Sequence, residues 1–337
     1  MIQRKEKNFP ALAVVLVIAI IALVLIVFAG INTFGEVNSV KIESEQEFTV
    51  KEGWGLDVVA KELEDEGIIE HPGIFKSKAK KMGVDTKIQP GTITVLPEMS
   101  YDEIIEALAF EDHSDKITIP EGYEIRQIAE VLEEAGLIDR EVFYEMLDPT
   151  LYDYEFLEDL PERENPLEGY LYPSTYHFNH GMSEENIIDK MLESFDENFV
   201  PEYYERAEEL NMSIDEIVTL ASIIEREAGT TDEMNKISGV FYNRLNTNMR
   251  LQSCATVQYI LQERKENLTT EDTKIDSPYN TYQNDGLPVG PIASPGRECI
   301  EAALYPEETE ALYFVLGADG KHIFSKTYEE HMAAQGE

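Results

Sequence analysis

One long apolar run near the N-terminus constrains this chain more than any other feature. No charged or strongly polar side chain occurs from position 11 to position 29, and a helix of roughly 20 apolar residues spans the hydrocarbon core of a bilayer. The charged residues ahead of the run are Arg4, Lys5, Glu6 and Lys7. Positive flanks stay on the cytoplasmic side. We therefore predict a cytoplasmic segment over residues 1–10, one transmembrane helix over 11–31, and extracytoplasmic domains after it.

A cleaved signal peptide is the alternative interpretation of the same run. Signal peptides have a shorter apolar region that ends at a small-residue cleavage site. Here the run is long, and Ile31, Asn32, Thr33 and Phe34 follow it without such a site. We favour an uncleaved single-pass protein in the cell membrane. No second run reaches spanning length, and the roughly 300 remaining residues suggest about two domains.

Charge and cysteine content exclude several classes of protein. The chain has 67 Asp and Glu residues against 27 Lys and Arg, a formal net charge of -40. Because nucleic-acid binding needs a basic surface, no nucleic-acid partner is expected. Two cysteines, Cys254 and Cys299, are too few for a disulfide-rich scaffold or a thiolate zinc site. A single disulfide bridge between these two cysteines remains an open alternative. No metal-spaced histidine motif occurs, so neither a metal nor a cofactor is expected.

An internal repeat organises the segment after the apolar run. The tripeptide at Glu52 recurs in similar form at Glu121, and each follows an alternating run and precedes an amphipathic helix with a Gly stop. Each copy predicts strand, helix, helix, strand, helix. The predicted strands are 47–50 and 91–95 in the first copy, and 116–119 and 169–178 in the second. Such units resemble LysM-like carbohydrate-binding modules.

The repeat and the helical pattern after it predict an α+β fold. We place a LysM-like module at 38–115 and a mixed α+β catalytic domain with a helical core at 116–337. The catalytic domain divides into a second LysM-like-related subdomain at 116–200 and an active-site subdomain at 201–337. Near the C-terminus, 312–315 and 321–324 predict a β-hairpin that turns at Asp319 and Gly320.

A predicted helix that starts after Ser213 carries two candidate acids. Ser213 and Glu216 form a capping box, and apolar residues follow at helical spacing. Glu225 and Glu227 lie on opposite edges of this stripe, each roughly 80° from its centre. A half-buried carboxyl holds its proton more tightly, which suits a general acid near neutral pH. The helical wheel alone leaves both glutamates open.

Two further features point to a substrate site. Arg244 and Arg250 are cations in a chain short of them, and either an ion-pair role or a role as ligands for a negative substrate group fits. The Pro- and Gly-rich stretch from 277 to 296 predicts a long ordered loop. Its tyrosines suit stacking on sugar rings, and its Asn and Ser side chains suit hydrogen bonds to sugar hydroxyls. A rigid connector is the alternative.

Several motifs in one order resemble the membrane-anchored endolytic murein transglycosylases, the YceG-like family. The matching segments are Ala221 to Glu227, Val240 to Leu245, Met249 to Gln252, Tyr279 to Tyr282, and the loop from Gly286 to Gly296. The resemblance places the catalytic acid on Glu227, with Glu225 as a supporting residue. The chain departs from the family where Cys254 and Ala255 replace a frequent Asp-Pro, and where Val289 replaces a frequent Pro.

The resemblance implies an endolytic lytic transglycosylase that cleaves the β-1,4 bond between N-acetylmuramic acid (MurNAc) and N-acetylglucosamine (GlcNAc) in nascent peptidoglycan strands. Its products would end in 1,6-anhydroMurNAc, which limits strand length. The expected partners are glycan strands, the membrane and peptidoglycan synthases. The residues expected to contact substrate are Asn243, Arg244, Gln252, Tyr279, Asn280, Tyr282 and Ser294. The alternatives are a non-catalytic peptidoglycan-binding anchor and a hydrolytic muramidase.

Overall fold

The computed structural model describes residues 40–97, 99–110, 114–158, 160–265 and 267–336. The predicted cytoplasmic segment and transmembrane helix lie outside these residues. Within the described ranges, no helix combines the length and the apolar character needed to cross a membrane.

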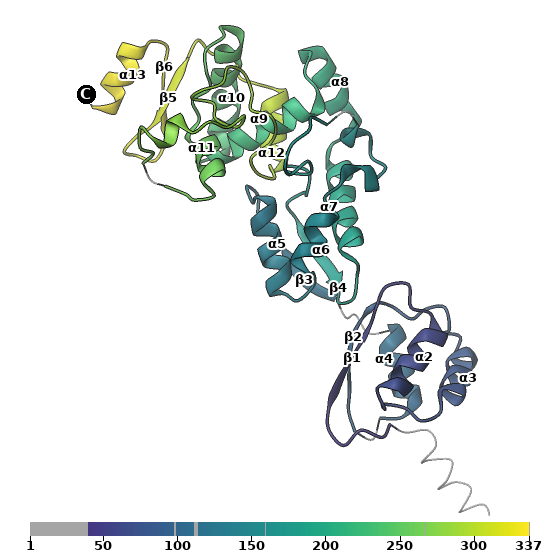
Figure 1. Ribbon diagram of the computed structural model, residues 1–337. Helices are drawn as coiled ribbons and strands as arrows, with labels where there is room; N and C mark the ends of the chain where they lie inside the picture. The colour runs from purple at the N-terminus through teal and green to yellow at the C-terminus, as the bar shows by residue number, and fades with distance from the viewer. Residues whose placement is uncertain (1–39, 98, 111–113, 159, 266, 337) are drawn as a thin grey trace, which may run out of the picture. The chain divides into compact units, whose positions relative to one another are not determined.

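Short strands and many helices make up the described chain, which confirms the α+β class (Figure 1). The strands are β1 (Gln46–Val50), β2 (Gly91–Val95), β3 (Ser114–Thr118), β4 (Thr175–Asn179), β5 (Tyr313–Leu316) and β6 (His322–Ser325). The α-helices are α2 (Leu56–Asp65), α3 (Pro72–Met82), α4 (Tyr101–Phe110), α5 (Ile125–Glu134), α6 (Arg140–Glu145), α7 (Glu184–Asn198), α8 (Pro201–Leu210), α9 (Ile214–Glu227), α10 (Thr231–Asn246), α11 (Cys254–Leu261), α12 (Arg297–Leu304) and α13 (Tyr328–Gln335). Three short 3-10 helices are η1 (Pro149–Leu151), η2 (Glu155–Leu157) and η3 (Asp272–Lys274).

The chain divides into two compact units. The first takes in the described residues up to Ser114 together with Asn179–Gly181, and the second takes in Asp115–Phe178 and the chain from Met182 onward. Each unit has its own hydrophobic core.

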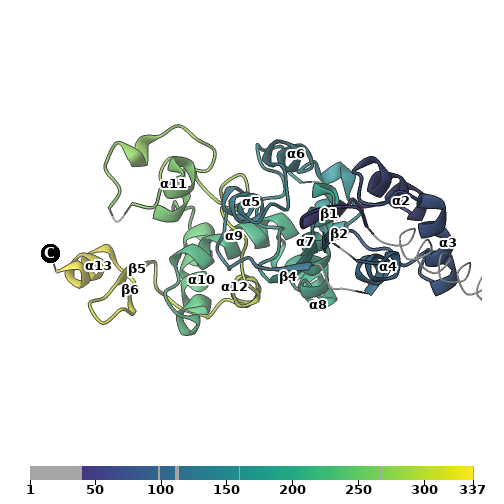
Figure 2. The same cartoon turned by 90° about the horizontal axis from the view of Figure 1, so that it is seen from below.

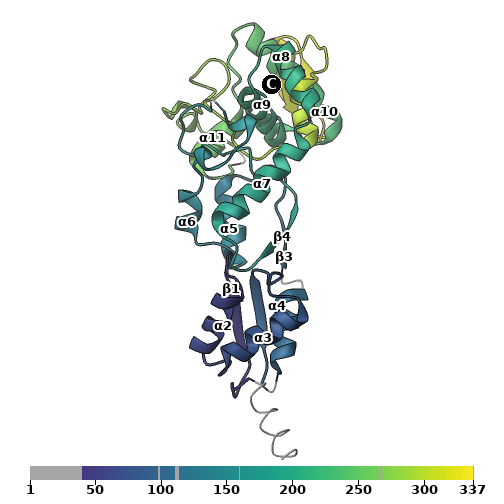
Figure 3. The ribbon, with the colours of Figure 1, turned by 90° about the vertical axis from the view of Figure 1, so that its right-hand side faces the viewer.

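The first unit is a two-stranded antiparallel sheet with three helices (Figure 3). Phe48 on β1 pairs with Ile93 on β2, and both side chains are buried. Thr49, between two buried residues, points outward, and its hydroxyl lies 2.7 Å from that of Thr92. This alternation is why the segment forms a strand with one face in the core. The element order is the one the sequence predicts, while the carbohydrate-binding resemblance stays a prediction.

The second copy of the repeat has the same element order but a shorter closing strand. β3 pairs with β4, and β4 begins at Thr175, so the predicted strand over 169–178 is wrong at its start. Gly169 has φ +90, and a Cβ on it would lie 2.6 Å from the Pro291 Cβ. The backbone at Gly169 therefore turns and packs closely against the later loop, where a strand could not fit.

Helix α9 is the centre of the second unit. Its buried residues run without a break from Ile217 to Ile224, and it packs against α8, α10, α11 and α12 (Figure 2). A helix that is apolar on nearly every side is stable only when neighbours cover it all round. The predicted hairpin is confirmed as antiparallel β5 and β6, with Phe314 opposite Phe324.

Candidate active site

The site is built on the C-terminal end of α9. The predicted capping box is present, since the Ser213 hydroxyl accepts from the Glu216 amide and the Glu216 carboxylate accepts from the Ser213 amide. The helix ends at Glu227, and Ala228 continues in extended backbone. The last turn of the helix lies beyond its buried part, so the polar side chains of this turn are half-buried.

Glu227 is held at one oxygen only. The Ser253 hydroxyl donates a hydrogen bond of 2.5 Å to its Oε1. Among the residues that the structure describes, no hydrogen bond reaches Oε2. A carboxyl group held on one side and open on the other has a fixed direction and one oxygen available for proton transfer, which is the geometry a general acid or base needs.

Ser253 is a residue of the candidate site that sequence reasoning missed. It is the N-cap residue of α11, where a serine hydroxyl usually accepts a helix amide, yet it makes no capping bond. Its own amide donates to Thr281 Oγ1 at 3.0 Å, and its carbonyl accepts from Thr256 Oγ1 at 2.9 Å. The backbone is thereby fixed, and the hydroxyl is free to donate to Glu227.

Glu225 is engaged on a different side of the helix. Its Oε2 accepts from the Gly296 amide at 2.9 Å, which ties the Pro- and Gly-rich loop to α9. Glu121 lies close to Gly296, and burial together with the charge of Glu225 raises the pKa of Glu121. Glu225 therefore acts as a structural anchor for the loop, and Glu227 is the carboxyl group that faces α11.

Three more side chains surround Glu227. Burial raises the pKa of the Cys254 thiol and of the Tyr282 hydroxyl, and the negative charge of Glu227 raises both further. The Cys254 Sγ lies 3.1 Å from the Tyr282 hydroxyl. Burial lowers the pKa of Arg244, which the charge of Glu227 partly opposes. The structure therefore brings Glu227, Tyr282 and Arg244 into one neighbourhood.

Arg244 and Asn243 also hold the backbone around the site. Arg244 donates to the carbonyls of Leu312 at 2.7 Å and Leu251 at 2.6 Å. The Asn243 amide donates to the carbonyls of Thr309 and Ala311. These bonds engage Nε and Nη1 of Arg244 and Nδ2 of Asn243, and the contacts of both side chains with substrate stay a prediction.

The loop before Gly286 is fixed in the same way. Asn280 is fully buried, its amide donates to the Ile275 carbonyl at 2.7 Å, and its Oδ1 accepts from the Tyr282 amide at 3.0 Å. Gln252 is exposed, has φ 46, and its backbone N–H donates to the Thr281 carbonyl at 3.1 Å. Asn280 thus orients Tyr282, and Gln252 is free to meet a ligand.

Ser294 and Tyr279 lie apart from this group. Ser294 exchanges backbone bonds of 2.8 Å with the Gly122 amide and the Tyr123 carbonyl, and its buried hydroxyl has no partner in the described chain. The Tyr279 ring lies 4.9 Å from that of Tyr259 and forms part of a cavity wall. Neither side chain reaches Glu227 through any bond described above.

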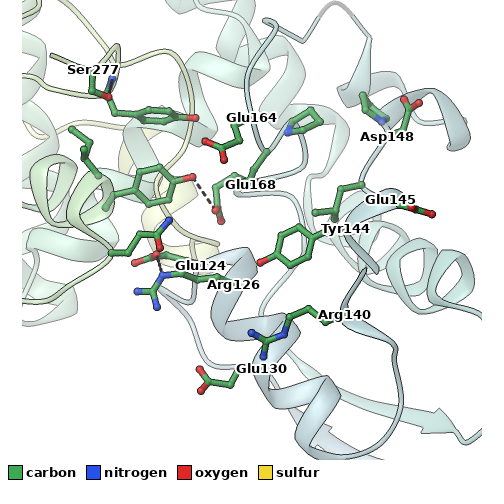
Figure 4. Close-up of a pocket in the computed structure, with 18 residues that line it drawn as sticks. Glu124, Arg126, Glu130, Arg140, Tyr144, Glu145, Asp148, Glu164, Glu168 and Ser277 are labelled. Atoms are coloured by element: carbon green, nitrogen blue, oxygen red, sulfur yellow. Dashed lines mark hydrogen bonds and ion pairs between the residues drawn. The ribbon is translucent and has the colours of Figure 1, made fainter. Parts of the chain in front are cut away.

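Glu168 is a second carboxyl group that the sequence did not single out. It is 1% exposed and accepts from the Ile125 amide at 3.0 Å. It also accepts from the Tyr259 hydroxyl at 3.2 Å, the bond that reaches Glu168 in Figure 4. Burial raises its pKa to about 8. The only sequence signal is its place between Leu167 and the aromatic stretch from Tyr170, where a charged residue stands among core residues.

The two cysteines are free thiols, which answers the question of a bridge; the Cys254 thiol is partly enclosed although the residue as a whole is exposed, and Cys299 is buried. Across the described ranges, no three His, Cys, Asp or Glu side chains are grouped to hold a metal ion. His322 is bound to Glu233, with its Nδ1 2.9 Å from Oε2, and so fixes the hairpin to α10.

Comparison with known proteins matches this arrangement to one family. The YceG-like family matches residues 48–337. An endolytic murein transglycosylase of Bacillus subtilis strain 168 is 32% identical over 92% of this chain and 90% of its own length. A protein of the same name from Streptococcus pneumoniae strain D39 is 32% identical over 84% of this chain, which spans 56% of that longer relative.

A solved structure agrees with the fold. The crystal structure of a yceG-like protein from Listeria monocytogenes has a TM-score of 0.60 and 34% identity, and the match covers 87% of this chain and 99% of the other. The prediction from the motifs around Glu227 is confirmed at the level of the family. The chain belongs to the YceG-like family, whose curated relatives are lytic transglycosylases by name.

Proposed function

We propose that this lytic transglycosylase cleaves the MurNAc-β-1,4-GlcNAc bond inside nascent peptidoglycan strands and leaves 1,6-anhydroMurNAc ends, which limits strand length. The observation that supports this reaction is the single open carboxyl group at the end of α9. Glu227 is fixed through Oε1 by Ser253, and Oε2 is left for substrate.

One carboxyl group serves both proton transfers of this reaction. Protonated Glu227 donates its proton to the glycosidic oxygen, and the bond from that oxygen to MurNAc C1 breaks. The GlcNAc side leaves as an alcohol, and positive charge develops at C1. The Glu227 carboxylate then takes the proton of the C6 hydroxyl of the same MurNAc, whose oxygen bonds to C1. Glu227 ends protonated, as it began, and no water is consumed.

The engagement of Glu225 favours this route over hydrolysis. A glycoside hydrolase usually needs two carboxyl groups, placed for a water molecule or for a covalent intermediate. Glu225 is the nearest acid along the helix, and its Oε2 is bound to the Gly296 amide. A muramidase is therefore the less favoured alternative. The contacts of Glu227 do not favour a non-catalytic anchor, because a glycan-binding surface does not need a carboxyl group held in one direction.

Location and partners complete the proposal. The apolar run over 11–31, with its positive N-terminal flank, supports a single-pass protein of the cell membrane with its catalytic domain outside the cytoplasm. The active site would then work close to where new glycan emerges. Peptidoglycan synthases are the partners that this location favours.

Digestion of uncrosslinked glycan strands by the full chain in detergent micelles tests the proposal. Mass spectrometry of the products is expected to show internal cuts with 1,6-anhydro ends, and Glu227→Gln is expected to produce none. Reducing ends would establish a muramidase. If the protein binds the strands but cuts none of them, both in micelles and on a supported membrane, it is a non-catalytic anchor.

A further inference from the structure

Thr281 holds the backbone just before α11 at two successive residues. It is 1% exposed, so its polar groups are shielded from water. Its carbonyl accepts from the Gln252 amide at 3.1 Å, and its Oγ1 accepts from the Ser253 amide at 3.0 Å. The second of these amides belongs to the residue whose hydroxyl donates to Glu227.

The loop around Thr281 is itself fixed. The Asn280 side chain, which is fully buried, donates to the Ile275 carbonyl at 2.7 Å and accepts from the Tyr282 amide at 3.0 Å. Arg250 Nη1 donates to the Tyr282 carbonyl at 2.9 Å. Thr281 therefore holds the start of α11 from a segment that has little freedom to move.

A second buried threonine holds the other side of Ser253. Thr256 is the third residue of α11 and is fully buried. Its hydroxyl donates to the Ser253 carbonyl at 2.9 Å, and its Oγ1 also lies 2.9 Å from Thr281 Oγ1. The backbone amide and carbonyl of Ser253 are thus bound by two hydroxyl groups that contact each other.

Each hydroxyl group has one hydrogen to donate, and this fixes the direction of the bonds. The Thr256 hydrogen goes to the Ser253 carbonyl, which can only accept. Thr281 is therefore the donor in the contact between the two threonines, and it accepts from the Ser253 amide. The three bonds close a ring through Ser253, Thr281 and Thr256, and bonds in such a buried network strengthen one another.

The ring leaves the Ser253 hydroxyl for Glu227. Both threonine hydrogens are used within the ring. A broken ring would leave a polar group of the Ser253 backbone buried without a partner, which is costly. The backbone of Ser253 therefore has one favoured arrangement, and its side chain leaves the backbone in the direction from which the hydroxyl reaches Glu227.

We propose that Thr281 and Thr256 are positioning residues for the cleavage reaction: their ring fixes Ser253, and Ser253 fixes the direction of Glu227. This inference rests on the proposed function. Within the described chain neither threonine has a hydrogen bond to Glu227, so both act through Ser253. The direction of the carboxyl group sets the rate, because proton transfer requires the acid within hydrogen-bond reach of the glycosidic oxygen and small displacements are costly.

A double-mutant cycle on the full-length chain in detergent micelles tests this role. The measurement is the rate of cuts in uncrosslinked glycan strands, counted by mass spectrometry whatever the chemistry of the new ends, and separated into kcat and KM. Thr281→Val keeps the shape of the side chain and removes the hydroxyl group. It should lower kcat by about three- to tenfold and leave KM within about twofold of the parent.

The combination of Thr281→Val with Ser253→Ala gives the decisive comparison. The double variant should be no slower than Ser253→Ala alone, about tenfold below the parent, because the hydroxyl group that the ring directs is then absent. Thr256→Val breaks the same ring from its other side and should show the same loss and the same dependence on Ser253. If Thr281→Val does not fold, the cycle with Thr256→Val decides.

Two matched controls separate the ring from general packing. Thr281→Ser keeps the hydroxyl group and should restore kcat to within about twofold of the parent. Thr219→Val makes the same chemical change at a buried threonine of α9. Thr219 has no hydrogen bond to the ring in the part of the chain that the structure describes, so this variant should also keep kcat within about twofold. Melting temperatures of all variants report their folding.

The outcomes distinguish this inference from the proposed reaction. A double variant whose loss equals the product of the two single losses would overturn the positioning role, because Thr281 would then act independently of Ser253. Thr281→Ser as slow as Thr281→Val would overturn it too, as would an equal loss in Thr219→Val. Each of these results leaves the reaction standing while Glu227→Gln stays inactive. Cutting by Glu227→Gln at the parent rate would contradict the proposed function, and the positioning role with it.

Discussion

Helix α11 contacts a carboxyl group at each of two places, and the two groups differ in almost every property that matters for catalysis. At its start, the Ser253 hydroxyl donates to Glu227, which is half-buried and has one oxygen open. Further along, the Tyr259 hydroxyl donates to Glu168, which is 1% exposed and also accepts from the Ile125 amide.

The difference shows what identifies an acid that can react. Burial raises the pKa of Glu168 to about 8, so this carboxyl group stays protonated at neutral pH. A raised pKa is often taken to indicate a catalytic acid. Here the group with that property is enclosed, and it supports the start of α5 and the position of Tyr259. The group that substrate can reach is Glu227.

The largest expected effect comes from Glu227→Gln. The amide keeps the shape of the side chain but cannot donate or accept the proton, so the rate should fall by about 10²–10⁴-fold, the range for general acid–base catalysis. The measurement is the rate of appearance of 1,6-anhydro ends, with circular dichroism as the control for folding. Activity within tenfold of the parent would break the assignment of the two glutamates.

Ser253→Ala should have the next largest effect, about tenfold on kcat, because it removes one charge-assisted hydrogen bond that orients Glu227. The measurement is the rate of appearance of 1,6-anhydro ends, separated into kcat and KM, with circular dichroism as the control for folding.

The matched control for this variant is Ser253→Thr, which keeps the hydroxyl group. It should restore kcat. A loss of kcat in Ser253→Thr as large as that in Ser253→Ala would show that the hydroxyl bond to Glu227 does not set the rate.

Glu225→Gln should affect stability more than chemistry. A hydrogen bond from an amide to a charged group contributes about 1.5–3 kcal/mol, and Gln still offers an oxygen to Gly296, so the expected loss is about 1 kcal/mol. Thermal unfolding measures it, and the rate should stay within about tenfold of the parent. A rate loss as large as that of Glu227→Gln would indicate two acids and a hydrolytic reaction.

The smallest effect on rate should come from Glu168→Gln, whose signature is in stability against pH. The folded chain keeps the proton of Glu168 up to a pH of about 8, whereas the unfolded chain releases it near its ordinary pKa of about 4.3. The free energy of unfolding therefore falls as pH rises through this window. Gln cannot ionise, so the melting temperature of the variant should rise relative to the parent from pH 5 to pH 8.

A melting temperature difference that is flat across this range would contradict the protonated state of Glu168. A rate for Glu168→Gln as low as that of Glu227→Gln would reverse the roles that the two carboxyl groups have in this account.

Local patterns in the sequence predicted the elements that depend on local chemistry. The capping box at Ser213 and the hairpin that turns near Gly320 are both present, because capping and turn residues act on neighbours a few positions away. The strand predicted over 169–178 begins only at Thr175. There, the close approach of Gly169 to Pro291 decides the backbone, and residues 122 positions apart leave no local signal.

For the candidate site too, the sequence predicted what depends on local chemistry and missed what depends on contacts between distant residues. The helical wheel placed Glu225 and Glu227 on opposite edges, and the structure gives them different partners on different elements. Ser253 was not predictable, because its bond joins residues from two helices and its position reads as an ordinary cap. Asn243 and Asn280 illustrate the opposite case, since polar side chains suited to sugar hydroxyls are also suited to backbone carbonyls.

The most direct test of the central claim is to run the cleavage in water labelled with ¹⁸O and to measure the mass of the new MurNAc ends by mass spectrometry. The account predicts 1,6-anhydro ends that carry no label, because the C6 hydroxyl of the sugar closes onto C1 with Glu227 as the only acid. Reducing ends that carry one ¹⁸O atom would show that water attacks C1, and the single-carboxyl account of Glu227 would then be wrong.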